Sequence, residues 1–378
     1  MAGRNVSGRV DRFWRRVTDG MQLSQLWDQF RADARTSYRL YSKEVDATPQ
    51  PGRSGLGRGI HLAVQFFWAV VEKLTPARRI LLLVALVLLF LGIQGSWAGA
   101  DGHGVSIRIG GGLWGGLLLL LLLLMEVGDR VVMKRDLQIA KEIQAWLLPS
   151  APPEVPGLAI AFATRAANTV AGDFYDIFPR PSCEGANATF LVAIADVAGK
   201  SVPAAMLMAT FQASLKTLSA ACTTLIDLVS KINTYACTNS QNGRRFTTAF
   251  IAEYDPAART LTYINAGHND PLLMRASGSV EKLTAGGLPL GVMDNAPYES
   301  ATVQLAPGDW IAAFTDGVIE AENLAQLQYG EDRLVTMLRW GATSSPALLL
   351  QALLADIDRF AQNAPQHDDI TCMLLRAI

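Results

Sequence analysis

The pattern of hydrophobic and polar positions divides this chain of 378 residues into an apolar region in its first third and a mixed region after it. Two long apolar runs lie at about 80–97 and 110–126, and the second contains uninterrupted leucines from Leu117 to Leu124. Each run approaches the ~20 residues that a membrane-spanning helix needs. A shorter apolar run within 60–74 cannot span and predicts an interfacial helix. We therefore predict a membrane region at 59–127, built around a transmembrane helical hairpin.

The charges around these runs predict how the hairpin is oriented. Basic residues flank its two outer ends: Arg78, Arg79, Arg130, Lys134 and Arg135. The intervening loop, 98–109, carries a single Arg and no Lys. By the positive-inside rule we expect a multi-pass protein of the cell inner membrane, with its N-terminus and its C-terminal domain in the cytoplasm. The alternative is an apolar hairpin buried in a soluble protein, which the leucine run disfavours.

The segment before the membrane region, 1–58, is polar and rich in arginine, with apolar residues interleaved among the charges. This pattern predicts one or two amphipathic helices that bind membrane lipid through anionic headgroups. A solvated cytoplasmic extension explains the same pattern equally well.

After the hairpin, 128–149 has the apolar spacing of a helix that ends at Pro149. One stripe is formed by Val132, Asp136, Ile139, Ile143 and Trp146, and a parallel stripe by Met133, Leu137, Ala140, Gln144 and Leu147. Spacings of three and four residues place each stripe on one face of the helix. We interpret this segment as a connector helix that forms a homodimer and also contacts the domain after it. The alternative is a helix that packs on its own domain alone.

From 150 to 378, short strand patterns mix with amphipathic helix patterns. Most strands follow one another through tight turns such as Asp255-Pro256, which favours antiparallel sheets. Helix patterns occur in pairs, at 202–218 with 224–238 and at 331–340 with 346–362. We therefore expect an α+β domain in which helices are layered on sheets.

Composition and charge narrow the classes of function. The formal net charge is −1 at pH 7, so no general attraction to nucleic acid is expected. The chain has 4 cysteines, which lie far apart and form no CxxC pair. They are typical of isolated thiols in a reducing compartment, not of a zinc site or a disulfide framework.

Four stretches of the mixed region share one design, in which an apolar strand meets aspartate and then glycine or a loop. They are AGDFYD at 171–176, IADVAGK at 194–200, FTDGV at 314–318 and HDDIT at 367–371. One such aspartate is usually a turn residue. Converging carboxylates repel one another unless cations neutralise them, so the repeated pattern predicts a metal site. With oxygen ligands alone, the metals are expected to be Mg²⁺ or Mn²⁺.

These stretches resemble the PP2C-like (PPM) bacterial serine/threonine phosphatases of the SpoIIE and RsbU type. Further similar stretches are YINAGHNDPLL at 263–273, GGLPLGV at 286–292 and LAPGDWIAAFTDGVIEA at 305–321. LQIAKEIQAWLLP at 137–149 resembles the helix that precedes the domain in this family. The resemblance covers about 137–378. It implies a β-sandwich flanked by helices, with two metal ions in a cleft at one end.

The resemblance also assigns roles to individual residues. It implies that Asp173 binds one of two Mn²⁺ or Mg²⁺ ions and that Asp196 bridges both. The carbonyl group of Val197 would contribute as well, and Asp316 and Asp369 would hold the other ion. A hydroxide activated by the two metals would then attack phosphorus directly, without a covalent phosphoenzyme.

Three further residues are candidates for an outer layer around the ions: Asp176, Asp368 and His268. For His268 the alternative is a structural loop histidine. The departures from the family pattern remove no carboxylate. One of them, Ser201, stands before the helix expected at 202–218, where serine is a good N-cap.

We thus predict a membrane-anchored, metal-dependent protein serine/threonine phosphatase that acts on a phosphorylated regulatory protein. In the family that it resembles, such a partner is commonly of the anti-anti-sigma kind. The alternative is a catalytically silent membrane scaffold that binds a phosphoprotein. A transporter or receptor is disfavoured because two spans leave little room for a transport pathway or a ligand pocket.

Overall fold

The computed structural model describes 67–68, 71–95, 111–180, 188–199, 201–221, 224–239 and 245–378. The arginine-rich segment 1–58 and the loop 98–109 lie outside these residues, as does most of the interfacial helix predicted at 60–74. The chain forms two compact units, Met1–Val131 and Val132–Ile378.

In the first unit, α4 (Pro76–Gly95) packs against the N-terminal part of α5 (Gly111–Leu147). The two helices approach closely at Gly115, where a Cβ atom would lie 2.7 Å from the carbonyl oxygen of Ala85. Arg78 of α4 forms ion pairs with Glu126 at 3.3 Å and with Asp129 at 2.7 Å. Glycine therefore permits the close packing, and ion pairs join the start of α4 to the middle of α5.

Both helices expose large apolar side chains, among them Phe90, Leu91, Leu113 and Leu124. Within the residues that the structure describes, no helix is both long enough and apolar enough to cross a membrane. The transmembrane hairpin stays a prediction from the sequence.

The second unit contains two sheets whose strands pair antiparallel, except that β8 is parallel to β5. The first sheet has the order β1-β11-β10-β6-β7. Its strands are β1 (Leu158–Arg165), β11 (Ile370–Ala377), β10 (Trp310–Phe314), β6 (Leu272–Met274) and β7 (Val280–Lys282).

The second sheet has the order β2-β3-β4-β5-β8, with β9 also paired to β5. Its strands are β2 (Phe174–Arg180), β3 (Thr189–Val197), β4 (Thr247–Asp255), β5 (Thr260–Ala266), β8 (Gly286–Gly287) and β9 (Ala301–Gln304). The α+β sandwich expected from the sequence is confirmed.

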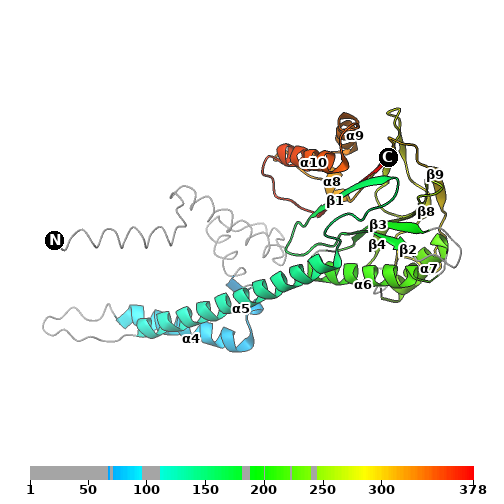
Figure 1. Ribbon diagram of the computed structural model, residues 1–378. Coiled ribbons are helices and arrows are strands. Elements are labelled where there is room, and N and C mark those ends of the chain that lie inside the picture. Colours follow the sequence, from blue (N-terminus) through cyan, green and yellow to red (C-terminus); the bar gives the residue numbers. More distant parts are fainter. Residues whose placement is uncertain are drawn as a thin grey trace, which may run out of the picture. The chain divides into compact units, whose positions relative to one another are not determined.

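Helices cover the outer face of each sheet, which gives four layers (Figure 1). The second sheet carries α6 (Val202–Ser219) and α7 (Leu225–Asn239). The first sheet carries α9 (Glu331–Trp340) and α10 (Pro346–Ala361), and the single-turn helix α8 (Asp316–Ile319) follows β10. One apolar cluster lies between the sheets, and one lies under each helix pair.

Strand β3 shows why the strands at the centre read as continuous apolar runs. Val192 and Ile194 point into the cluster between the sheets, while Leu191, Ala193 and Ala195 point toward α6 and α7. Because both faces of this strand are covered, apolar residues are needed at consecutive positions. This strand ends at the candidate site.

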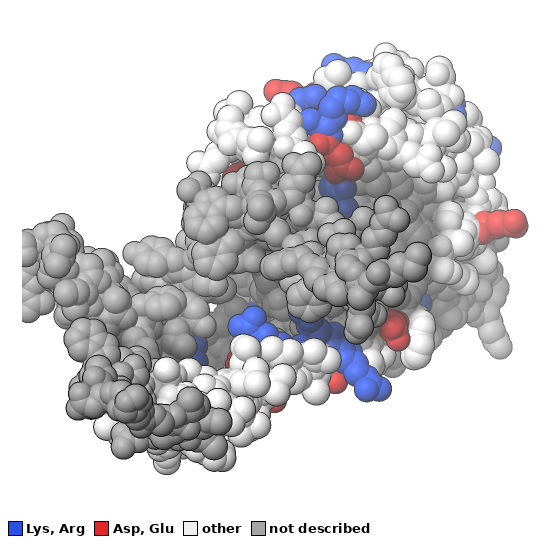
Figure 2. Space-filling model, turned by 90° about the vertical axis from the view of Figure 1, so that its left-hand side faces the viewer, with Lys and Arg blue, Asp and Glu red and all other residues white. Residues whose placement is uncertain are grey.

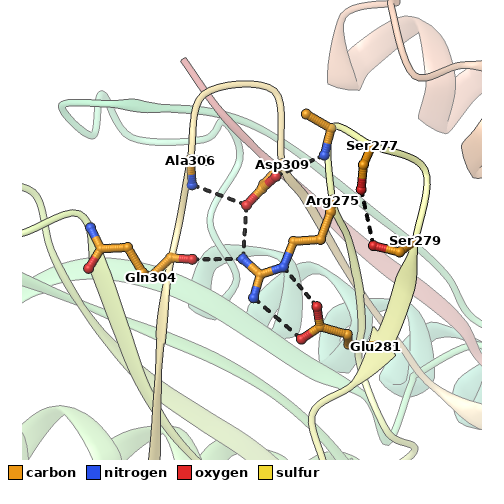
Figure 3. A network of polar contacts seen from close by, with 8 residues as sticks. Arg275, Ser277, Ser279, Glu281, Gln304, Ala306 and Asp309 are labelled. Atoms are coloured by element: carbon orange, nitrogen blue, oxygen red, sulfur yellow. Dashed lines mark hydrogen bonds and ion pairs between the residues drawn. The ribbon is translucent and has the colours of Figure 1, made fainter.

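A polar corner joins the two sheets where the chain passes from β9 to β10 (Figure 3). Arg275 donates to the carbonyl oxygen of Gln304 at 2.8 Å, to Asp309 at 3.0 Å and to Glu281 at 2.9 Å. The buried carboxylate of Asp309 also accepts the N–H groups of Ala276 and Ala306. This network lies at the start of β10, whereas the candidate site lies at its end.

The surface carries charges of both signs. On the face shown in Figure 2, blue and red side chains are interspersed among uncharged ones in the described part. This distribution matches the formal net charge of −1.

Candidate functional site

The strand pairings bring the four aspartates to two places, one in each sheet. In the second sheet, Asp173 immediately precedes β2, and Phe174 pairs with Ala195, next to Asp196 on β3. In the first sheet, Asp369 immediately precedes β11, and Asp316 follows the end of β10. Antiparallel pairing places the start of one strand beside the end of its neighbour, so each sheet presents two carboxylates at one edge.

Hydrogen bonds connect the two pairs across the sandwich. Asp369 accepts the N–H of Ala167 at 2.7 Å and the N–H of Gly172 at 2.6 Å. The hydroxyl group of Thr315, which precedes Asp316, donates to Asp173 at 2.9 Å. Each sheet therefore supplies a donor to an aspartate of the other sheet.

Two threonines of the first sheet extend this network. The hydroxyl group of Thr315 accepts the N–H of Thr371 at 3.0 Å, and the hydroxyl groups of Thr371 and Thr164 lie 2.7 Å apart. The sequence does not mark Thr164 and Thr371 as residues of the site, because a threonine in a strand is ordinarily a β-former.

The site is electrostatically unfavourable for free carboxylates. Burial raises the pKa of Asp173 well above its ordinary value, and the nearby charges of Asp196 and Asp369 raise it further. Hydrogen bonds from Thr371 and Thr315 act in the opposite direction. A neighbouring cation would relieve the repulsion, because it favours the charged form of each carboxyl group. Among the residues that the structure describes, however, no three acidic, histidine or cysteine side chains are arranged to hold a metal ion.

Two glycines of the motifs allow the backbone to approach closely. A Cβ atom at Gly317 would lie 2.0 Å from the carbonyl oxygen of Asp369. A Cβ atom at Gly172 would lie 3.2 Å from the carbonyl oxygen of Val197, the group expected to contribute to metal binding. Glycine beside Asp316 is therefore required by packing, and glycine beside Asp173 avoids a tight contact.

Two of the outer-layer candidates, Asp176 and Asp368, make other contacts in the structure. Asp176 lies on the face of β2 that carries Phe174 and Phe178, and it forms an ion pair with Lys216 of α6 at 2.8 Å. This face points toward the helices and not between the sheets. Asp368 accepts the N–H of Asp369 at 3.0 Å, so it supports the turn that presents its neighbour.

His268, the third outer-layer candidate, is buried close to β3. Its Nδ1 atom lies 3.1 Å from the hydroxyl group of Thr248, which is 3.4 Å from the carbonyl oxygen of Asp196. Burial lowers the pKa of His268 to about 4. The imidazole is therefore neutral near pH 7, which favours the structural role over proton donation to a leaving group.

The connector helix reaches the loop before Asp173 through Gln144, which the sequence places in an apolar stripe but gives no role at the site. Gln144 of α5 donates to the carbonyl oxygen of Ala171 at 2.7 Å and accepts the N–H of Ala171 at 2.9 Å. The amide of Gln212 also donates to the carbonyl oxygen of Leu147. The predicted contact between the connector helix and the domain is confirmed. A polar residue in an otherwise apolar stripe was the signal in the sequence that could have identified Gln144, which the structure buries.

The other stripe of the connector helix faces solvent. Val132, Ile139, Ile143 and Trp146 are all exposed, and 80% of the Trp146 surface is accessible. The helix itself begins earlier than expected, because α5 continues without a break from Gly111 to Leu147. The predicted homodimer stays a prediction.

The predicted N-cap at Ser201 was wrong. Its backbone has φ 66° and ψ −146°, and its side chain makes no capping hydrogen bond. An N-cap residue normally has extended backbone, which points the side chain at the first N–H groups of the helix. Here the loop after Asp196 forces a conformation that favours glycine.

Comparisons with known proteins agree with this arrangement. The family model described as "Stage II sporulation protein E (SpoIIE)" matches residues 186–378, which include Asp196, Asp316 and Asp369. Protein IcfG of Synechocystis sp. is 26% identical over 275 residues, or 65% of this chain and 42% of that protein. Phosphoserine phosphatase RsbU of Bacillus subtilis is 27% identical over 250 residues, or 66% of this chain and 72% of that protein.

Solved structures share the fold of the second unit. The SiaA-PP2C domain of Pseudomonas aeruginosa has a TM-score of 0.57 and 22% identity, and the match covers 66% of this chain and 99% of that domain. The PP2C phosphatase domain of SpoIIE from Bacillus subtilis, with a fragment of its regulatory domain, has a TM-score of 0.50 and 18% identity. That match covers 58% of this chain and 63% of that structure. With the family model matching more than half of its length, the chain belongs to the SpoIIE family, and its second unit has the PP2C-like fold.

Proposed function

We propose that this chain is a metal-dependent protein serine/threonine phosphatase of the PP2C type. The observation that carries the proposal is a pair of hydrogen bonds, Gly172 to Asp369 and Thr315 to Asp173, which join the strand ends of Asp173 and Asp196 to those of Asp316 and Asp369. The hydrogen bond from Gly172 to Asp369 ties the two pairs together at 2.6 Å. The names of relatives support the activity, since RsbU is called a phosphoserine phosphatase.

The donor set fits hard divalent ions such as Mn²⁺ or Mg²⁺. Asp173 would bind one of two ions, and Asp316 and Asp369 would bind the other. Asp196 would bind both ions, and the carbonyl group of Val197 would contribute as well. Burial and the charges of Asp196 and Asp369 raise the pKa of Asp173, and a divalent ion would stabilise the charged carboxylates in such an environment. When bound, the two ions would lower the pKa of a water molecule and offset charge on the phosphoryl oxygens.

The protein's own contribution is to orient these carboxylates. Thr315 holds one oxygen of Asp173, while two main-chain N–H groups hold Asp369. Each of these oxygens has a further lone pair that remains able to face an ion. Binding would require the aspartates to turn toward the ions from the positions that the structure records.

The substrate of the proposed reaction is a phosphoserine or phosphothreonine on a regulatory protein. The family resemblance favours a partner of the anti-anti-sigma kind. We also propose that the chain is anchored in the cell inner membrane and forms a homodimer through the connector helix. The apolar runs at 80–97 and 110–126 support the anchor, and the exposed stripe with Ile143 and Trp146 supports the dimer.

Hydrolysis of p-nitrophenyl phosphate by the purified full chain tests the activity. We expect hydrolysis that depends on Mn²⁺ and is lost in Asp196→Asn and Asp316→Asn. Asp332→Asn, an exposed change on α9, is the matched control and should retain the rate. A raised melting temperature with Mn²⁺, absent in Asp196→Asn, would report ion binding independently of activity. A wild-type chain that binds a phosphoprotein but hydrolyses nothing would establish the silent scaffold instead.

Fractionation tests the anchor and the dimer. The full chain should stay in the membrane pellet after alkaline carbonate extraction, and release into the supernatant would contradict the anchor. In detergent, Ile143→Glu should shift the mass measured by light scattering from dimer to monomer. Lys141→Glu, an exposed change on another face of the same helix, should not.

A further inference from the structure

A cleft of about 840 Å³ opens beside the candidate site on the side of the first sheet. Gly317 and Asp368 line it, and these residues adjoin Asp316 and Asp369 in the chain. Its other walls come from the loop after α8, the end of α10 and the loop at 363–368. The volume suits a few side chains of an extended segment and is too small for a folded domain.

The charges that line this cleft are mainly acidic. Four carboxylate residues face one arginine: Glu320, Glu322, Asp358 and Asp368 against Arg165. Arg165 is paired with Asp358 at 2.6 Å, so its charge is offset within the wall. The formal charge of the lining is therefore −3 with His367 neutral. The whole chain has a net charge of −1, which makes this concentration of negative charge a local property.

We propose that this cleft binds a cationic segment of the protein substrate, with lysine or arginine residues that flank the phosphorylated residue. The inference rests on the proposed phosphatase function. A substrate whose phosphate reaches Asp316 and Asp369 must pass its neighbouring residues along the cleft that begins at Gly317 and Asp368. Acidic residues beside the phosphorylated residue would be repelled by the carboxylates of the cleft, whereas basic residues there would be attracted. The negative potential of the cleft also attracts such a segment from solution.

Two synthetic phosphoserine peptides, identical except for arginines or glutamates beside the phosphoserine, test this inference on the Mn²⁺-loaded full chain. The measured quantity is the ratio of their kcat/KM values, which does not depend on how much of the enzyme is folded. We expect the wild type to prefer the arginine peptide by about tenfold or more, as several exposed charge pairs would give. Glu320→Gln combined with Glu322→Gln should reduce the ratio to about two or three.

The control variant combines Glu299→Gln with Asp332→Asn, which changes the total charge equally at exposed positions outside the cleft. It should keep the wild-type ratio. The wild-type ratio should also fall steeply as salt is raised toward 1 M, where the screening length drops to about 3 Å. This second measurement holds even if the double cleft variant fails to fold.

Equal rates on the two peptides, or a ratio that survives the cleft substitutions, would overturn the inference. If the wild type hydrolyses p-nitrophenyl phosphate but does not distinguish the peptides, the inference alone fails. If it hydrolyses neither p-nitrophenyl phosphate nor the peptides, the proposed function fails and the inference fails with it.

Discussion

Replacing Gln144 with leucine tests how firmly the connector helix is fixed to the loop that carries Asp173. The amide of Gln144 makes two hydrogen bonds to Ala171, at 2.7 and 2.9 Å. Ala171 is 3% exposed and Gln144 is 8% exposed, so water does not readily replace the amide. Leucine is of similar size but has neither a donor nor an acceptor. Both main-chain groups of Ala171 would then be buried without a partner.

The expected loss of stability follows from the two main-chain groups of Ala171. A buried polar group that loses its partner costs about 1–3 kcal/mol. After allowance for the apolar surface that leucine buries, we expect the free energy of unfolding to fall by about 2–4 kcal/mol. With an m value of about 2–3 kcal/mol/M, the urea midpoint would fall by about 1 M.

Gln138→Leu is the matched control on the same helix. Its side chain is exposed and makes one long contact, 3.4 Å to Glu142. An exposed change of this kind usually stays within about 0.5 kcal/mol. If the two variants shift the urea midpoint equally, the hydrogen bonds of Gln144 do not contribute in solution and the reasoning is refuted.

The same variant should affect the site, because Ala171 adjoins Gly172. The N–H of Gly172 donates to Asp369, and the next residue is Asp173. We expect the Mn²⁺ concentration for half-maximal hydrolysis of p-nitrophenyl phosphate to rise about tenfold in Gln144→Leu, which corresponds to about 1.4 kcal/mol. An unchanged Mn²⁺ requirement in a destabilised variant would mean that the helix supports the domain without positioning the site.

Three further predictions concern stability and reactivity. Asp309→Ala removes the acceptor shared by Arg275 and two main-chain N–H groups. The free energy of unfolding measured in urea should therefore fall by about 2–4 kcal/mol. A change below about 0.5 kcal/mol, as a surface mutation gives, would contradict the network of Figure 3. Ser201→Gly should raise the free energy of unfolding by about 1 kcal/mol, because the backbone angles φ 66° and ψ −146° are strained for serine and the side chain makes no capping hydrogen bond. A lower urea midpoint for the variant would argue against that conformation. Burial raises the pKa of Cys372 to about 12, so its thiol is protonated at pH 8 in the folded protein. It should therefore react with iodoacetamide only after unfolding. Peptide mapping that finds Cys372 modified in the native state would disprove its burial.

Much of the second unit could be predicted because its elements are encoded locally. The strand at β3 and the helix at α6 are read from runs of apolar residues and from the period of the pattern. The short elements were missed: β7 and β8 have three and two residues, and α8 has four. Such elements are too short to show a period, and pairing with neighbouring strands defines them.

The candidate site divides in the same way. The aspartates at 173, 196, 316 and 369 were visible because each belongs to a motif of adjacent residues. Their partners were not visible, since the bond from Thr315 to Asp173 joins residues 142 positions apart. Asp176 shows that a residue close to the motif in sequence can point in another direction. It lies three residues from Asp173, yet the alternation of the strand turns it toward Lys216 and α6.

The sequence alone indicated a metal site, because repeated aspartates at strand ends repel one another unless cations neutralise them, and the family resemblance of the motifs implied the phosphatase reaction. The sequence also determined the layered fold, because apolar periodicity specifies which face of each element is buried. Tertiary structure decided how the aspartates are held, that Gln144 of the connector helix binds the main chain of Ala171 near Asp173, and that an acidic cleft lies beside the site. Glu320, Asp358 and Asp368 come from separate segments, and no local pattern relates them. Contacts between such distant segments depend on how the layers pack, and that packing is determined by the whole sequence and not by a local pattern.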